Sequence, residues 1–470
     1  MAGSKSGKGP KNILNDLDFK TWLRFQKSFD RYDFGNDGFP TELGDIARNF
    51  VRFFSKHTID YHPSSILTNL SLMQDADGRN IVKIEGDPLY PEWQRDAESG
   101  DDGFYDYALL KTEGIADASH SDVDNFFQFL SRNLKDHSYG TVLARDGKEE
   151  YPYVWSFATA CRRYLLLCDE KVFLDSQSIC APVYALQFRK QEEKLPQTRF
   201  KTNIKTTHID RIPTYIIPRP APRKKHEFKH PAKFPEELID QLIVTFTKES
   251  DWVLDVMAGT GSALISAHRN RRNSVGIELN HEFYDIAKKR MYEANPVRLP
   301  GFESPFTSEL ILGDARNAAA LLAEKKGDIK YCITSPPYWD MLHNPGSEGQ
   351  RSRKQKGLQL VYSESEHDLG NITDYYVFLS ALKEVFNSVA KVLADDGKLT
   401  IITKNVKRNG SFYTLAWDLV EQLAGSEGSY NFLGYTLWCQ DDAGLKPFAI
   451  GHHWVSNTLH QYCLHFSKSV

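Results

Sequence analysis

The half of the chain from residue 228 to residue 470 is predicted to be an α/β domain, with a mostly parallel sheet wound by helices on both faces. The first observation behind this prediction is that short apolar segments alternate with amphipathic segments of helical period. The second is that Gly-rich or acidic turns follow several apolar segments, as they do at the carboxyl ends of strands in such sheets. With 470 residues, 41% apolar and 26% charged, the chain has the composition of a globular protein of about two or three domains.

The elements of this half follow one another in a regular order. An amphipathic helix is expected over residues 234–247, where Pro235 suits a first helical turn. Two further helices are expected over 262–271 and 281–294. The predicted strands are short and apolar, and they cover residues 252–257, 274–279, 310–315, 331–335, 398–403 and 460–467.

The first 200 residues carry a different pattern. Residues 1–12 are rich in Gly, Ser and Lys and are predicted to be a disordered tail, and residues 13–200 are predicted to be a mixed α+β domain. Segment 43–54 has apolar residues at helical spacing, but no motif here indicates a chemistry.

Charge is unevenly distributed, although the net charge is only −4. Residues 75–124 hold 14 acidic and 4 basic side chains, which we interpret as a solvated face. Residues 189–233 hold 13 basic and 4 acidic side chains and include the Pro-rich segment 201–227. This basic segment is either an interdomain linker or a surface that neutralises phosphates.

Composition also disfavours several classes of protein. No run of about twenty apolar residues is present, so no membrane span is expected. The N-terminus lacks the apolar core of a signal peptide. Six cysteines without a C-x-x-C pair predict reduced thiols, a cytoplasmic location and no metal site.

A Gly-rich turn lies between the first predicted strand of the second half and the helix after it. In DVMAGTGS (255–262), Ala258, Gly259 and Gly261 allow a sharp backbone turn and the close approach of a ligand. Glu278 ends the next strand, where a carboxylate can accept hydrogen bonds from the hydroxyls of a ribose. The spacing differs from the G-x-G-x-x-G of dinucleotide sites, so the turn alone indicates only a nucleotide-binding site.

Two more predicted strands end in groups that carry chemistry. Asp314 ends the strand 310–315 and is suited to accept a hydrogen bond from an adenine amine. The strand 331–335 runs into TSPPYW, in which two prolines fix the backbone and two large aromatic residues follow. Because parallel strands present their carboxyl ends on one edge of a sheet, all of these groups are expected to converge.

This ordered combination resembles the DNA amino-methyltransferases, which use S-adenosylmethionine to methylate N4 of cytosine or N6 of adenine. The likeness rests on DVMAGTGS, GIELN, GDAR and TSPPYW together with HPAKFPEEL (230–238), and it covers about residues 228–470. It implies a Rossmann-like methyltransferase domain with a mostly parallel, seven-stranded, doubly wound sheet. It also implies S-adenosylmethionine as the cofactor.

The resemblance further implies roles for the residues of these motifs. The residues implied to bind the cofactor are His230, Phe234, Pro235, Asp255, Ala258, Gly259, Thr260, Gly261, Ser262, Glu278, Asp314 and Thr334. Those implied to be catalytic are Ser335, Pro336, Pro337 and Tyr338.

Elementary chemistry supports such a role for TSPPYW. An exocyclic amine is a poor nucleophile because its lone pair is delocalised into the base. If Ser335 Oγ and the carbonyl of Pro336 accept its two hydrogens, the lone pair returns to nitrogen and the amine attacks the methyl group directly. Tyr338 is then expected to stack on the base and Trp339 to wall the pocket. A target base in duplex DNA has to be flipped out to reach such a site.

The first residue of the SPPY tetrad indicates the target base. Family members with Ser in this position mostly methylate cytosine N4, and those with Asp or Asn mostly methylate adenine, so Ser335 favours N4-methylcytosine. Adenine N6 is the alternative within the family, and an RNA or a protein glutamine is an alternative substrate. A methylase fold that binds DNA without turnover is a further alternative, which the intact tetrad and Glu278 disfavour.

Basic residues downstream of the tetrad are candidates for holding DNA. Besides Trp339, the candidate DNA-binding residues are Arg351, Arg353, Lys354, Lys356, Lys404 and Arg408. A solvated loop is the alternative for the residues at 351–356. By elimination, residues 13–200 are the candidate for recognising a DNA target; dimerisation and binding of a partner protein are the alternatives. The predicted partners are double-stranded DNA with a flipped target base and, in a prokaryotic restriction–modification or related defence system, a cognate partner protein.

Overall fold

The computed structural model divides the chain into two compact units, which are described separately. Unit 1 comprises residues 1–199, 407–412 and 441–460, and unit 2 comprises residues 200–406, 413–440 and 461–470. The predicted tail 1–12 lies outside the residues that the structure describes. The described residues are 17–55, 65–70, 79–97, 103–113, 118–145, 153–177, 180–191, 204–207, 212–218, 235–294, 305–339, 367–408, 411–440 and 458–469.

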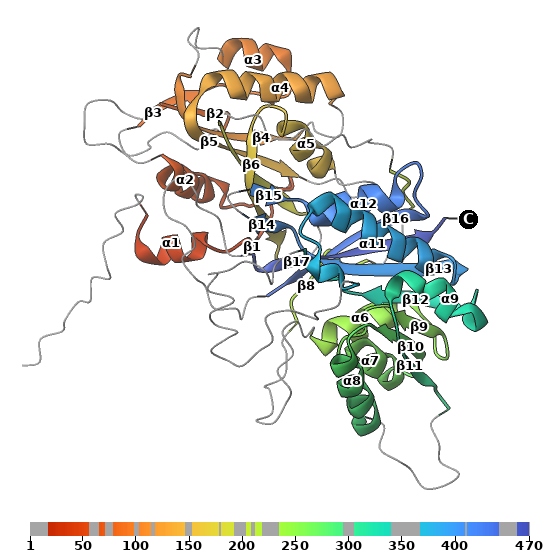
Figure 1. Ribbon diagram of the computed structural model, residues 1–470. Helices are drawn as coiled ribbons and strands as arrows, with labels where there is room; N and C mark the ends of the chain where they lie inside the picture. Colours follow the sequence, from red (N-terminus) through yellow and green to blue (C-terminus); the bar gives the residue numbers. More distant parts are fainter. Residues whose placement is uncertain are drawn as a thin grey trace, which may run out of the picture. The chain divides into compact units, whose positions relative to one another are not determined.

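Unit 2 is built on one sheet with the strand order β11-β10-β9-β12-β13-β17-β16-β8 (Figure 1). The strands from β11 to β13 pair in parallel, whereas β17 runs antiparallel to β13. The prediction of a mostly parallel sheet is thus confirmed, and a short eighth strand, β8, extends one edge by pairing with β16. The strands are β8 (Tyr215–Ile216), β9 (Trp252–Asp255), β10 (Asn273–Glu278), β11 (Ser308–Leu312), β12 (Ile329–Thr334), β13 (Leu393–Thr403), β16 (Tyr430–Cys439) and β17 (His460–Lys468).

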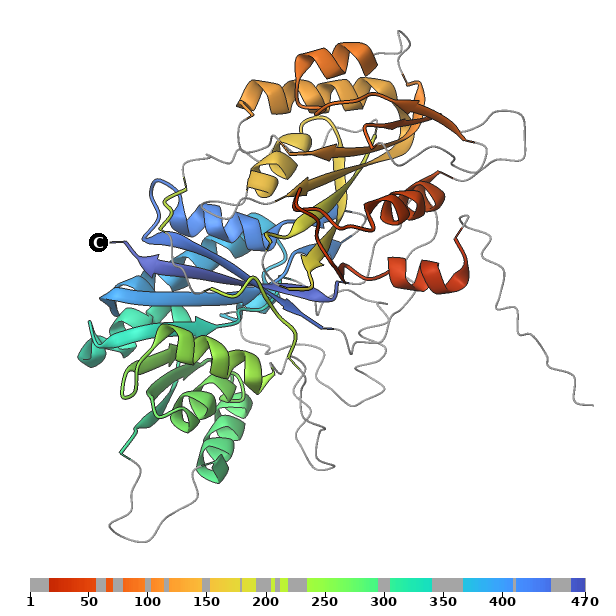
Figure 2. The ribbon, with the colours of Figure 1, turned by 180° about the vertical axis from the view of Figure 1, so that it is seen from behind.

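Helices cover both faces of this sheet, as the doubly wound prediction requires (Figures 1 and 2). On one face, α6 packs on α7 and α7 on α8, and on the other face α11 packs on α9 and α12. Apolar side chains of α6, including Leu238 and Leu242, form a core with Tyr331 and Ile402 of the sheet. The helices are α6 (Glu236–Phe246), α7 (Ser262–Arg269), α8 (His281–Ala294), α9 (Ala318–Leu321), α11 (Tyr375–Ala390) and α12 (Leu415–Ala424), with 3-10 turns η2 (Ala315–Asn317), η3 (Ala323–Lys325) and η4 (Leu369–Asn371).

Unit 1 has its own sheet, with the order β1-β6-β7-β5-β4-β2-β3. Strands β3, β2, β4 and β5 pair in parallel, and β7 is antiparallel to both β5 and β6. The strands are β1 (Phe29–Tyr32), β2 (Ser65–Thr68), β3 (Asn80–Lys83), β4 (Tyr105–Thr112), β5 (Leu134–Arg145), β6 (Leu166–Asp175) and β7 (Val183–Arg189).

The helices of unit 1 are short, and side-chain caps help to fix where they begin. Ser119 caps α4 and exchanges hydrogen bonds with Asp122 in a capping box, which satisfies backbone groups of the first turn. The helices are α1 (Phe19–Phe25), α2 (Leu43–Phe54), α3 (Pro91–Ala97), α4 (His120–Asn133) and α5 (Tyr153–Cys161). A separate two-stranded sheet joins β14 (Val406–Arg408) and β15 (Ser411–Tyr413). None of the helices in the described ranges has the length and apolar character that a membrane span needs.

Candidate active site

A pocket in unit 2 lies at the carboxyl ends of β9, β10 and β12. It is lined by groups from each of the strand ends that the sequence singled out, so the predicted convergence holds within this unit. The predicted cofactor-binding residues that line it are Asp255, Ala258, Gly259, Thr260, Ser262, Glu278 and Asp314. The four predicted catalytic residues, Ser335, Pro336, Pro337 and Tyr338, line the same pocket.

The Gly-rich turn between β9 and α7 depends on two glycines. Gly259 and Gly261 both have positive φ angles, of 53° and 79°, in the left-handed region that side chains with a Cβ rarely adopt. At Gly261 a Cβ would also lie 3.1 Å from the Cβ of Ala287, so this position in addition lets α7 and α8 approach closely. Gly261 itself does not line the pocket; it shapes the turn that does.

Glu278 is a buried carboxylate held in place by the backbone. Its Oε2 accepts a hydrogen bond from Gly259 N at 2.6 Å, and its Oε1 accepts one from Asn280 N at 2.8 Å. Burial raises the pKa of Glu278 to about 7, and these backbone hydrogen bonds oppose that rise. The carboxylate therefore lies at the end of β10 with its oxygens oriented by the Gly-rich turn.

A second buried carboxylate links β9 to β12. Asp255 Oδ1 accepts hydrogen bonds from Thr334 Oγ1 at 2.7 Å and from Met257 N at 3.1 Å. Burial raises the pKa of Asp255 to about 6, and the bond from Thr334 opposes the rise. Because Thr334 directly precedes Ser335, this bond fixes the start of the SPPY tetrad against the Gly-rich turn.

A chain of hydroxyl hydrogen bonds runs through the tetrad. Ser335 Oγ donates to Tyr338 Oη at 3.3 Å, and Tyr338 Oη donates to Gln461 Oε1 of β17 at 2.6 Å. The ammonium of Lys404 lies 5.4 Å from the centre of the Tyr338 ring, within the range of a cation–π contact. Because the hydrogen of Ser335 points to Tyr338, the lone pairs of Ser335 Oγ are left to accept hydrogen bonds.

Trp339 does not line the pocket but anchors the loop that does. Its side chain is only 3% exposed, its Nε1 donates to the carbonyl of Thr373 at 3.2 Å, and its ring packs on Tyr375 and Tyr413. Its φ of +30° is unusual for a bulky residue, and such a conformation persists only where its surroundings enforce it. The packing of the Trp339 ring supplies that constraint.

Asp314 is engaged by a neighbouring cation. Arg316 forms an ion pair with it, with Nη2 2.6 Å from Oδ2, and Asp314 also accepts from the backbone N of Arg316. Burial would raise the pKa of Asp314, but the hydrogen bonds from Arg316 outweigh it and lower the pKa. The carboxylate is thus ionised, and an amine donor must share it with Arg316.

The remaining predicted site residues lie in different places. Pro235 is the N-cap of α6, and Arg408 lies in β14. The predictions for some residues concern positions outside the described part of the chain, and these residues are His230, Phe234, Arg351, Arg353, Lys354 and Lys356.

Several pocket residues were not predicted from the sequence. Asn280 and Phe283 flank Glu278, and His367, Asp368 and Leu369 come from the turn before α11. Asn280 Oδ1 accepts from Glu282 N and Phe283 N at the start of α8, and Asn before a helix is a recognisable capping signal. No pattern marks the turn at 367–369, which only the folded chain brings to the pocket.

The side chains of this pocket fit S-adenosylmethionine. Glu278 offers buried acceptors for ribose hydroxyls, and Phe283 and Leu369 offer apolar surface for an adenine ring. The carboxylates of Asp255, Glu278 and Asp368 together complement a cation such as a sulfonium.

Comparison with known proteins shows a likeness to one family of enzymes over part of the chain. A sequence model of the family described as DNA methylase, of the N6 and N4 type, matches residues 125–289, including the Gly-rich turn and Glu278. The match covers about a third of the chain, and this likeness supports S-adenosylmethionine as the cofactor. The match begins upstream of residue 228, where the likeness was expected to start, and it ends before TSPPYW.

Individual relatives match this chain over shorter stretches. The type II methyltransferase M.MthZI of Methanothermobacter thermautotrophicus is 43% identical over 142 residues, which are 29% of this chain and 37% of the relative. The type II methyltransferase M2.DpnII of Streptococcus pneumoniae is 39% identical over 67 residues, 14% of this chain and 25% of the relative. The chain thus spans less than half the length of these curated relatives.

A solved structure shows a more distant likeness. An rRNA methylase of Streptococcus thermophilus is 12% identical, with a TM-score of 0.29, over 51% of this chain and 98% of the other. The fold assignment accordingly rests on the strand order of unit 2 described above.

Cofactor binding to this chain is expected to weaken at acidic pH. Below the Glu278 pKa of about 7 the carboxyl is protonated and loses acceptor capacity, so Kd should rise by roughly tenfold per pH unit well below it. Calorimetric titration with S-adenosylmethionine at pH 8 and pH 6 measures this change. The E278Q variant is the control because its amide cannot titrate in this range. It should bind the cofactor more weakly, and its Kd should change less between pH 8 and pH 6. An equal change of Kd with pH in both proteins would assign the effect to another group.

Proposed function

We propose that this chain is a DNA methyltransferase that transfers the methyl group of S-adenosylmethionine to the exocyclic N4 amine of cytosine. The observation that carries the proposal is that Ser335 and Pro336 line the same pocket as Glu278 and the Gly-rich turn. One pocket therefore offers acceptors for an amine beside a site for the methyl donor. The likeness of residues 125–289 to the DNA methylase family supports DNA as the substrate.

In this proposal the chain activates the amine by accepting its hydrogens. When bound, S-adenosylmethionine supplies an electrophilic methyl group. Ser335 Oγ accepts one hydrogen of the amine, which it is free to do because its own hydrogen is donated to Tyr338. The carbonyl of Pro336 accepts the other, and Pro337 removes a backbone donor from the loop. The lone pair is thereby returned to nitrogen, and the remaining contribution is the alignment of the amine with the methyl group.

The same proposal includes how the base and the DNA are held. A duplex cytosine has to leave the stack to enter the pocket, where the Tyr338 ring, fixed through its hydroxyl to Gln461, offers a surface for stacking. Lys404 lies beside this ring and can contact a phosphate. The type II relatives support a role in a prokaryotic restriction–modification system or a related defence system.

Nucleoside analysis of DNA tests the proposed base. Genomic DNA from a host that expresses the full chain is digested to nucleosides and resolved by mass spectrometry, with the S335A variant as the matched control. We expect N4-methylcytosine with the unaltered chain and much less of it with S335A. N6-methyladenine in its place would keep DNA as the substrate and contradict the assignment of cytosine from Ser335. The absence of both marks would contradict the proposal that DNA is the substrate.

A further inference from the structure

The sheets of the two units have the same strand order. Unit 1 has the order β3-β2-β4-β5-β7-β6-β1, and unit 2 has β10-β9-β12-β13-β17-β16-β8, with β11 added beside β10. The directions agree as well, since the first four strands of each series pair in parallel, and β7 and β17 are antiparallel to β5 and β13. Each series ends in an extra strand, β1 or β8, that pairs in parallel with its neighbour.

The helices take corresponding places along the chain. Helix α2 precedes β2 as α6 precedes β9, α4 leads into β5 as α11 leads into β13, and α5 precedes β6 as α12 precedes β16. Between β3 and β4, unit 1 has α3, where unit 2 has α8, β11 and α9. In the described residues, the strand matching β11 is therefore the one element of the sheet of unit 2 that unit 1 lacks.

The correspondence extends to individual side chains. The pairing registers place Tyr107 of β4 where β12 has Tyr331, and Thr141 of β5 where β13 has Thr400. In both units the buried tyrosine Oη donates to the buried threonine Oγ1 at 2.7 Å. A buried polar pair of this kind is an uncommon feature in a sheet core, and here it recurs at the same register position.

The two sheets also share an irregularity. Where β4 advances by two residues, its partner β5 advances from Leu134 to Tyr139. Where β12 advances by two residues, its partner β13 advances from Leu393 to Lys398. An equivalent bulge thus follows a leucine at the same register position in each unit. Bulges are specific features of a fold rather than defects.

The residues at the carboxyl ends of β2, β3 and β4 in unit 1, and of β9, β10 and β12 in unit 2, are called the rim of each unit. The two rims differ. Glu85 takes the register position of Glu278, but its side chain is 86% exposed and pairs with Lys83. The chain between β2 and β3 covers only residues 69–79, whereas residues 256–272 hold the Gly-rich turn and α7. The segment between β2 and β3 is thus six residues shorter than its counterpart in unit 2.

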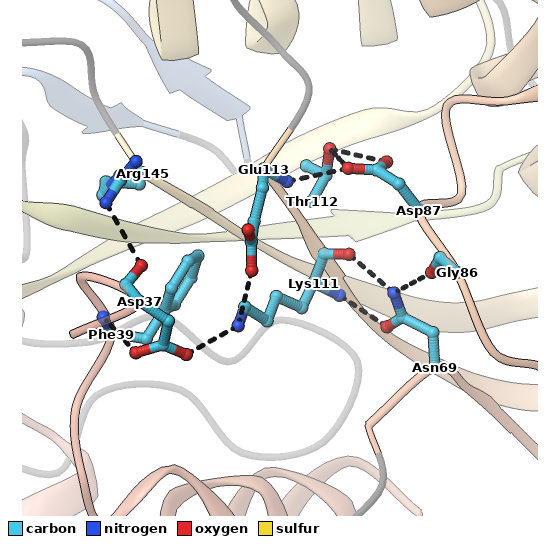
Figure 3. Close-up of polar contacts among 9 residues, drawn as sticks. All are labelled: Asp37, Phe39, Asn69, Gly86, Asp87, Lys111, Thr112, Glu113 and Arg145. Carbon is cyan, nitrogen blue, oxygen red and sulfur yellow. Dashed lines mark hydrogen bonds and ion pairs between the residues drawn. The ribbon is translucent and has the colours of Figure 1, made fainter. Parts of the chain in front are cut away.

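Asn69 ties the rim strands of unit 1 to one another (Figure 3). Its Nδ2 donates to the carbonyls of Gly86 at 2.8 Å and Lys111 at 2.7 Å, and its Oδ1 accepts from Lys111 N at 2.8 Å. Lys111 stands at the register position of Ser335. The Asn69 side chain therefore joins the end of β4 to the segment after β3. The corresponding strand ends of unit 2 line its pocket.

A second set of contacts closes the same rim (Figure 3). Asp87 accepts from Thr112 Oγ1 at 2.9 Å and from Glu113 N at 2.8 Å. Lys111 Nζ lies 2.9 Å from a carboxylate oxygen of Asp37 and 2.8 Å from one of Glu113. These polar groups at the rim thus bind one another, and their net charge is negative.

From these observations we infer that unit 1 is a second copy of the methyltransferase fold of unit 2, with a rim closed by Asn69 and Asp87, so that the chain binds one cofactor, in unit 2 alone. The family match supports this inference, because it begins inside α4 and includes β5, β6 and β7 of unit 1. The stoichiometry rests on the proposed function, since it presupposes that unit 2 binds S-adenosylmethionine.

Calorimetric titration of the full chain with S-adenosylmethionine tests the number of sites. We expect one molecule per chain, a Kd raised by about 10²–10³-fold in E278A, and an unchanged stoichiometry and Kd in E85A, the matched control at the corresponding position. Two molecules per chain, or one molecule bound to E278A with the Kd of the unaltered chain, would overturn the inference. No binding to the unaltered chain would refute the proposed function instead and agree with a closed rim.

Hydrogen exchange tests the closed rim without any cofactor. The amides of Lys111 and Glu113 donate to Asn69 and Asp87, so both should exchange slowly in the full chain. In N69A the Lys111 amide should exchange at least roughly tenfold faster, since its acceptor is lost, while Asp87→Asn retains an acceptor oxygen and should keep the Glu113 amide slow. Fast exchange of both amides in the unaltered chain would show that the rim is open and contradict the inference.

Discussion

Replacing Ser335 by Ala should lower kcat by about 10²–10³-fold, as losing one positioned hydrogen-bonding group at a reaction centre does. The side chain shrinks by one oxygen atom, and the backbone of the tetrad is retained because Thr334 still donates to Asp255. Cofactor binding should therefore stay within about twofold of the unaltered chain, since the lost interaction acts mainly in the transition state. Single-turnover kinetics on DNA, with calorimetry for the cofactor, measure the two effects separately.

Tyr338 provides the companion variant for this experiment. Tyr338→Phe keeps an aromatic ring for stacking but removes the acceptor for the Ser335 hydrogen and the donor to Gln461. Its kcat should fall less than that of S335A, by roughly tenfold, because the serine can find another acceptor. An S335A variant with full activity would remove Ser335 from the mechanism, and a Tyr338→Phe variant weaker than S335A would make the phenol the more important group.

Replacing Glu278 by Ala should raise the Kd for S-adenosylmethionine by about 10²–10³-fold. Two hydrogen bonds from ribose hydroxyls to a carboxylate contribute about 1.5–3 kcal/mol each when made to a charged group, and their sum need not be fully additive. Glu278 also accepts from Gly259 N and Asn280 N, so its loss loosens the Gly-rich turn as well. Calorimetric titration of the full chain measures the change directly.

Two variants separate these contributions of Glu278. Glu278→Gln keeps one acceptor oxygen and the shape of the side chain, so its Kd should lie between those of the unaltered chain and E278A. Thermal unfolding of E278A shows whether the turn or the whole unit is weakened. A Kd for E278A equal to that of the unaltered chain would show that Glu278 does not hold the ribose, and it would contradict the assignment of the cofactor site to unit 2.

Much of unit 2 could be predicted because its signals are local. Apolar strands alternate with amphipathic helices, and the groups at the strand ends stand next to one another in sequence, as Thr334 and Ser335 do. Once the sheet is parallel, its geometry brings these strand ends to one edge. The convergence of Asp255, Glu278 and Ser335 on one pocket therefore followed from the pattern.

Other parts of the site depend on residues far apart in sequence. Gln461, which lies in β17, accepts a hydrogen bond from the hydroxyl of Tyr338. The turn at 367–369, which precedes α11, lines the same pocket as the tetrad. Neither carries a motif, because a glutamine in a strand or an aspartate in a turn is common in any protein. Trp339 was expected to wall the pocket, yet the space beside Tyr375 and Tyr413 holds its ring.

By itself, then, the sequence of this chain determined the strand–helix order of unit 2, the Gly-rich turn and the strand-end side chains, because each depends on neighbouring residues. Only the tertiary structure decided the hydrogen-bond chain from Ser335 to Gln461, the anchoring of Trp339, and the likeness of unit 1 to unit 2. That likeness lies in strand order, register and a shared tyrosine–threonine bond. Pairing between strands that are distant in sequence sets these features. Because many different side chains are compatible with the same backbone pairing, no local sequence pattern predicts them.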